Sequence, residues 1–392
     1  MLHYRQRLPV YENYVGKLER GVVRWPGALY REAIVAVLGA AHERDLGFGP
    51  TGARRAVGAD PAEEVGAPMS MAAASTRLLD AMAPTPWPAR VGPPEIDQIW
   101  RAARAFSIWD NLYGGLAREA PLAQLRWSAG LIQSSSCAAH LRPDLLSAVG
   151  YLAHTCGFMA FDSHAFDDAR RLLSFGVCCA EDAGNWHLRA RLLATRARLD
   201  TWVGDPHGGL TQVQLALVRS DRLTATERAM LHSLEARALA RLHKAEETMA
   251  AIGRADDAFA CKDTAADPPW MGFYDAAQHE GDAGTALLDL ALAMLAGASG
   301  ARRRHETAIS GREPDLRRSR ALSQIGLAKL TMARGDPAEA VSLGFAALES
   351  AGHIRSLRIA DDLRHLDLLA EPHSGREDVA DLRERLRQAM PS

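Results

Sequence analysis

Apolar residues recur at helical spacing from residue 95 onward, in segments of roughly 15 residues. Turns that contain Gly-Asp, Asp-Pro or a single Gly separate these segments, and long alternating runs of β-branched residues are absent. Ala and Leu, which favour helices, carry most of the apolar content. The pattern predicts an all-α fold built from a series of helical hairpins.

Small residues recur at fixed offsets within this series. Gly157, Ala169 and Gly176 are spaced twelve and then seven residues apart, and the same spacing returns further along the chain. The other sets are Ala197, Gly209 and Ala216; Ala328, Ala340 and Ala347; and, more weakly, Ala236, Thr248 and Ala255. Two helices can pack at a short interaxial distance only where small side chains face each other. We therefore expect these positions to lie where paired helices cross.

A Gly-Asp pair lies midway in two of the sets, at Gly204 with Asp205 and at Gly335 with Asp336. Small residues around such a turn resemble the tetratricopeptide repeat, whose period is about 34 residues. Most of the large aromatic residues of that repeat are missing, so the repeats are degenerate. We expect a tetratricopeptide-like α-solenoid, in which each hairpin packs on its neighbours.

Residues 13–21 predict a short helix near the start of the chain. Asn13 can cap its first turn, Val15 and Leu18 lie three residues apart on one face, and Gly21 can end it. The opposite face is basic and includes Lys17. A capped helix of this kind is typical of a recognition helix that binds in the DNA major groove, although many surface helices share these features.

The composition changes between these two parts of the chain. Residues 47–68 are rich in Gly, Pro and Ala, and five prolines between residues 84 and 94 exclude a continuous helix. We divide the chain into an N-terminal domain at 1–48, a linker with a short helix at 49–94, and a helical repeat domain at 95–392.

The chain resembles actinobacterial transcriptional regulators of the XRE class, which join a Cro/repressor-type helix-turn-helix to a tetratricopeptide-like domain. The resemblance rests on residues 13–26, 30–48, 157–173 and 267–281. It implies these DNA-binding residues: Asn13 as the cap of the recognition helix, Tyr14, Gly16 and Lys17 at base edges or phosphates, and Arg20 and Arg24 at the DNA backbone. It also implies a homodimer that binds double-stranded DNA, with a repeat domain that senses a peptide, a protein or a small-molecule ligand.

The N-terminal domain departs from the pattern of this family. Only residues 1–7 stand in place of the first helix, Pro9 replaces the glycine of the turn, and Arg5 replaces a small residue. We expect a truncated helix-turn-helix. Either the reading frame begins upstream, or DNA binding has decayed, or a partner supplies the missing core. The alternative functions are a protein-interaction scaffold that does not bind DNA and, as a minor alternative, a cryptic enzyme.

Charge and cysteine content bound the class of protein. The net charge of the 392 residues is −2, yet residues 1–55 hold nine Lys or Arg against five Asp or Glu, as phosphate contact would require. The five cysteines have no paired spacing, which favours reduced thiols in a cytoplasmic protein. Neither a signal peptide nor a membrane-spanning run is present in the sequence, so we expect no membrane partner.

The sequence contains no motif typical of an enzyme, so we predict no catalytic residues, no cofactor and no metal site. His154 and Cys156, two residues apart on a helix, would point in different directions and could not share a metal.

Two clusters remain as candidates for binding. Trp270, Phe273 and Tyr274 would lie on one helix face, either packed between hairpins or forming the wall of a groove for a ligand or partner. Arginines at 302–304, 312, 317, 318 and 320 form a basic cluster, which indicates a solvated face or a site for an acidic ligand or partner.

Overall fold

The computed structural model describes residue 35 and residues 86–114, 118–294, 297–312, 316–352 and 356–390. The predicted DNA-binding residues, Asn13 to Arg24, lie outside the described residues. Contacts between Cα atoms separate Thr85–Ser392 as one compact unit from Met1–Pro84. The helices and strands that follow belong to the unit Thr85–Ser392.

Fourteen α-helices form seven consecutive hairpins in the described part of the chain, and the all-α helical-repeat fold predicted from the sequence is confirmed. The hairpins are α4(Pro93–Tyr113) with α5(Glu119–Ser134), α6(Arg142–Asp162) with α7(Phe166–Asp182), α8(Trp186–Trp202) with α9(Pro206–Leu217), α10(Ala225–Arg241) with α11(Ala245–Ala260), α12(Ala276–Met294) with α13(Ala298–Gly311), α14(Arg317–Arg334) with α15(Pro337–Ala351), and α16(Leu357–Ala370) with α17(Glu377–Ala389). None of these helices is both long and apolar enough to cross a membrane.

Short elements complete the unit. Strand β1(Arg90–Val91) pairs in parallel with β2(Ser136–Cys137) beside the first hairpin. Three 3₁₀ turns lie in the connections: η2(Ser220–Arg222), η3(Pro269–Met271) and η4(Glu371–His373).

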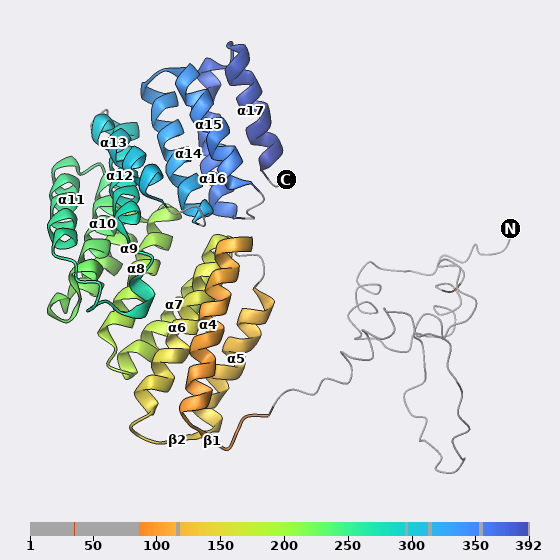
Figure 1. Cartoon of the computed structure of the whole chain (residues 1–392), viewed down its shortest axis with the longest axis vertical. Coiled ribbons are helices and arrows are strands. Elements are labelled where there is room, and N and C mark those ends of the chain that lie inside the picture. Colours follow the sequence, from red (N-terminus) through yellow and green to blue (C-terminus); the bar gives the residue numbers. More distant parts are fainter. Residues whose placement is uncertain are drawn as a thin grey trace, which may run out of the picture. The chain divides into compact units, whose positions relative to one another are not determined.

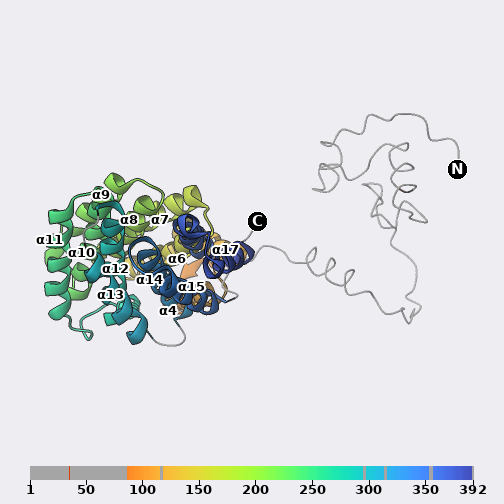
Figure 2. The ribbon, with the colours of Figure 1, turned by 90° about the horizontal axis from the view of Figure 1, so that it is seen from above.

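The hairpins stack into an inner and an outer layer of helices (Figures 1 and 2). From α6 to α16, each even-numbered helix packs against the next even-numbered helix, and these helices form the inner layer. The odd-numbered helices pack on their outer side. The stack curves so that α14 and α16 come close to the end of α4 (Figure 1). This curvature gathers side chains from the whole unit around one centre.

The predicted small residues lie at the helix crossings. Every residue of the four sets is buried. A Cβ atom added at Gly209 would stand 3.0 Å from the carbonyl oxygen of Ala197, and one added at Gly157 would stand 3.5 Å from that of Ala169. The close approach expected between paired helices is therefore confirmed at these positions.

Three of the turns between paired helices share one geometry, whereas Gly335, in the second predicted Gly-Asp turn, has a φ of −128°. Gly204 adopts a φ of +92°, and the Asp205 carboxylate accepts a hydrogen bond of 2.8 Å from the amide of Gly208. His164 and His243 take the same left-handed conformation, at φ of 58° and 60°, in the turns after α6 and α10. Histidine tolerates this region better than most residues do, so these turns form without a glycine.

A pair of glycine substitutions tests the close packing. Gly209→Ala places a methyl group against the α8 backbone and is expected to lower the free energy of unfolding by about 1–2 kcal/mol. Gly253→Ala, on α11, meets no atom within 4 Å and is expected to raise it by about 0.5–1 kcal/mol. Urea denaturation of the full chain measures both. Equal stabilisation by the two substitutions would contradict the packing described here.

Candidate functional site

A cavity of about 190 Å³ lies at the centre of the curved stack, and we call it the central cavity. Its lining comes from all seven inner helices, α4 to α16, and from the segments before α12 and α14. Five of the lining residues are arginines: Arg191, Arg198, Arg312, Arg318 and Arg358. So many guanidinium groups in one cavity need carboxylates to balance their charge.

Two of these arginines join the two ends of the stack. Arg318 on α14 donates to the Asp110 carboxylate at 2.8 Å and to the Asp110 carbonyl oxygen at 3.2 Å, at the end of α4. Arg358 on α16 donates to the Asp162 carboxylate of α6 at 2.8 Å, and Arg318 lies 3.7 Å from the same carboxylate. We call these four residues the closure cluster.

The closure cluster is buried, and its charges remain because they are paired. Burial acts to raise the pKa of Asp162, but Arg358 and Arg318 outweigh it, so this pKa lies below the usual value. Burial acts to lower the pKa of Arg318, and Asp110 and Asp162 more than compensate. Buried charges of this kind are stable only as a complete set.

Two further arginines of the cavity also have partners. Arg198 makes two hydrogen bonds, of 3.0 and 3.3 Å, with the Asp282 carboxylate of α12. Arg312 donates to the Gln278 side chain at 3.1 Å and lies 3.8 Å from Asp275. Four of the five arginines are therefore compensated by a carboxylate.

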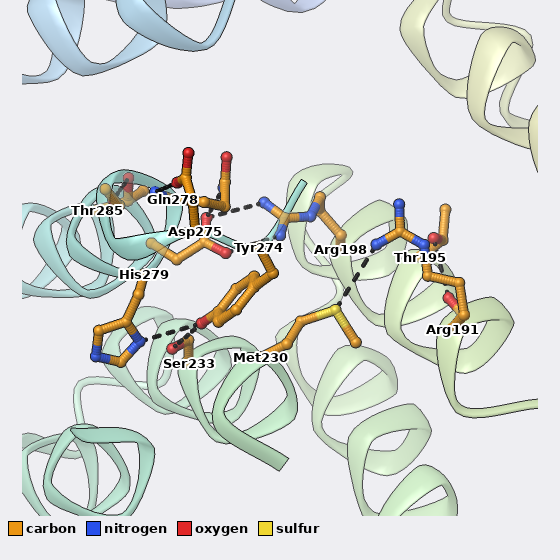
Figure 3. Close-up of polar contacts among 12 residues, drawn as sticks. Arg191, Thr195, Arg198, Met230, Ser233, Tyr274, Asp275, Gln278, His279 and Thr285 are labelled. Carbon is orange, nitrogen blue, oxygen red and sulfur yellow. Dashed lines mark hydrogen bonds and ion pairs between the residues drawn. The ribbon is translucent and has the colours of Figure 1, made fainter. Parts of the chain in front are cut away.

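Arg191 is the exception. Its guanidinium lies over the Phe273 ring at 3.9 Å and donates only to the sulfur of Met230, at 3.7 Å (Figure 3). Its Nε is buried without a hydrogen-bond partner, and none of the described carboxylates lies within 4.0 Å of it. Burial lowers the pKa of Arg191 to about 10, so it keeps its charge at neutral pH.

His154, on α6, lies beside Arg191 and is uncharged. Burial, reinforced by the charge of Arg191, holds the pKa of His154 well below its usual value. Its Nε2 lies 2.9 Å from the Thr195 hydroxyl. That hydroxyl donates to the Arg191 carbonyl oxygen at 3.2 Å (Figure 3). Because that hydroxyl has one hydrogen, the Nε2 of His154 is the donor in the first bond.

A chain of polar side chains next to the cavity has the order of a catalytic relay. Asp256 pairs with His279 at 2.8 Å. His279 lies 3.3 Å from the Tyr274 hydroxyl, and that hydroxyl lies 2.9 Å from the Ser233 hydroxyl (Figure 3). Ser233 is only 1% exposed, so its hydroxyl is not accessible to a substrate. The chain connects α10, α11 and α12.

The three aromatic residues predicted as a stripe take separate places. Only Phe273 lines the central cavity. Trp270 lines a neighbouring recess of about 400 Å³ with Trp100 and Tyr151, whereas Tyr274 is buried. The predicted helix is wrong here, because the 3₁₀ turn η3 ends at Met271 and α12 begins only at Ala276.

The basic cluster predicted from the sequence divides between surface and cavity. Arg302 pairs with Glu339 at 2.9 Å, and Arg303 is exposed. Arg304 pairs with Asp256, while Arg312 and Arg318 face the central cavity.

Arg191, Arg198 and Arg358 were not among the residues predicted from the sequence. One signal was available, because Arg191, Thr195 and Arg198 are spaced four and three apart and so share one face of a helix. As for metals, the described residues contain no group of three His, Cys, Asp or Glu side chains that could hold an ion, and the five cysteines form no disulfide.

Comparison with known proteins adds no assignment. No protein-family model matches this chain, and no curated protein sequence matches it.

Substitution of Arg318 tests the closure cluster. Arg318→Met leaves Asp110 and Asp162 with less compensation in a buried place, and we expect it to lower the free energy of unfolding by about 3–5 kcal/mol. Arg317→Met, one residue earlier and exposed, is the matched control and should change it by less than about 0.5 kcal/mol. Denaturant unfolding of the full chain measures both, and similar effects would contradict the role of the cluster.

Proposed function

We propose that the helical repeat unit is the sensor domain of a DNA-binding transcriptional regulator and that it binds a small anion in the central cavity. The observation that carries the sensor part is Arg191, a partly buried guanidinium that faces the cavity without a carboxylate partner. The DNA-binding part rests on the resemblance of residues 13–26 to the recognition helix of XRE-class regulators.

The charge balance of the cavity favours an anion with one charged group. The neighbouring arginines already have carboxylate partners, whereas Arg191 has none. A ligand carboxylate or phosphate oxygen would supply the missing acceptor, and a hydrogen bond to a charged group is worth about 1.5–3 kcal/mol. Phe273 holds the guanidinium in place, so little side-chain freedom is lost when the ligand binds.

The size of the cavity favours a small molecule. Its volume of about 190 Å³ lies below the range of roughly 300–1,000 Å³ that is typical for drug-sized ligands. All seven inner helices contribute to the lining, so hairpins from both ends of the stack bound the cavity. This arrangement suits a sensor, since binding can change the preferred curvature of the stack.

Anion binding at Arg191 can be measured by thermal shift. We expect at least one of sodium benzoate, sodium hexanoate and sodium phosphate to raise the melting temperature of the full chain above that in sodium chloride of matched ionic strength. Arg191→Met should abolish the rise, whereas Arg303→Met, at an exposed position, should retain it. No rise with any anion, or an equal rise in Arg191→Met, would overturn the sensor proposal.

DNA binding can be measured by gel shift with a pool of random-sequence duplexes. We expect binding at about 50 mM salt that falls steeply towards 200 mM, because phosphate contacts release counterions. Lys17→Ala should reduce the slope of this fall by about one, and Lys244→Ala should not. Absence of binding at the lowest salt would instead favour the protein-interaction scaffold.

A further inference from the structure

One wall of the central cavity is a row of rings on α6. Tyr151, His154 and Phe158 are spaced three and four residues apart, so they lie on one face of the helix, and all three line the cavity. The Tyr151 and His154 ring centroids are 5.9 Å apart at 11°, and those of His154 and Phe158 are 6.4 Å apart at 24°. The three rings are thus close to parallel and follow one another along α6.

The row continues beyond the cavity. Trp270 lies 5.4 Å from Tyr151, and Trp100 lies 5.8 Å from Trp270 with their planes only 3° apart. Tyr151 lines both the central cavity and the recess that holds these two tryptophans.

Arg191 lies on the neighbouring helix α8, against Phe273. Arg191 lines the same cavity as the three rings, and the Thr195 hydroxyl connects it to the row, since this hydroxyl lies 2.9 Å from the Nε2 of His154 and donates to the Arg191 carbonyl oxygen. Burial lowers the pKa of His154 and raises that of Tyr151, and the charge of Arg191 acts to lower both. Tyr151 and Phe158 are only partly buried, so they offer ring surface to the cavity. One small molecule can therefore place an acidic group on Arg191 and a flat ring against the row of rings on α6.

We propose that the ligand of the central cavity is a small aromatic carboxylic acid, with its carboxylate on Arg191 and its ring against Tyr151 and Phe158. This inference rests on the proposed anion site and specifies its ligand class. Aromatic rings prefer offset-stacked or edge-to-face contacts with other rings, and an aliphatic ring of the same size makes neither. A carboxylate also matches the single unpaired guanidinium in charge.

Isothermal titration calorimetry of the full chain with benzoate and with cyclohexanecarboxylate tests the ligand class. The two acids have the same charge and nearly the same size, and they differ in the flat ring. We expect benzoate to bind about tenfold more tightly. Arg191→Met should weaken both by about ten- to a hundredfold, whereas Arg303→Met should weaken neither.

The ring contacts are tested by Tyr151→Leu and Phe158→Leu. Each should reduce the preference for benzoate to about threefold or less and leave the affinity for cyclohexanecarboxylate unchanged. That unchanged affinity also shows that each variant is folded. Because the measured quantity is a ratio of two affinities in one variant, a general loss of stability does not produce the expected result.

The outcomes separate this inference from the proposed function. If the two acids bind with equal affinity and Arg191→Met loses affinity for both, the aromatic ligand class is overturned and the anion site is supported. Binding of neither acid, together with no response to hexanoate or phosphate, would overturn both. The last probe is a tetrapeptide that ends in phenylalanine. If it binds more than tenfold more tightly than benzoate, the ligand is a peptide, and the proposal of a small aromatic acid is overturned.

Discussion

The closure cluster of Asp110, Asp162, Arg318 and Arg358 is the interaction on which the rest of this unit depends. In a stack of hairpins, most contacts join neighbours along the chain, and nothing local prevents the stack from opening. Here Arg318 reaches a residue 208 positions earlier in the sequence. Two buried pairs thereby fix the curvature of the whole stack, and the price of removing one partner is an uncompensated charge in the interior.

The same closure encloses the central cavity and places Arg191 in its lining. An open stack would leave the inner arginines in water, where an unpaired guanidinium is ordinary. The curved stack brings five of them into one space, where the closure cluster pairs Arg318 and Arg358, and where Asp282 and Asp275 pair Arg198 and Arg312. The fifth, Arg191, lies over Phe273, and no carboxylate in the described part of the chain lies within 4.0 Å of it.

The fold was predictable where the physics is local. Small residues at fixed offsets marked the crossings of four hairpins, because a side chain as small as Ala or Gly is required there. The hairpin of α12 and α13 was missed: Ala301 and Ala308 keep the spacing of seven, but Gly284 stands seventeen residues before Ala301 instead of twelve. The left-handed turns at His164 and His243 were missed as well, since no glycine marks them.

The sequence by itself determined the helices and their pairing into hairpins, because helical periodicity and close packing act between residues near in the chain. Only the tertiary structure decided which arginines are paired. Arg312 and Arg318 read as part of one basic cluster, yet Arg303 of that cluster is exposed while those two face the cavity. Pairing across the stack depends on the summed curvature of seven hairpins, which no local pattern encodes.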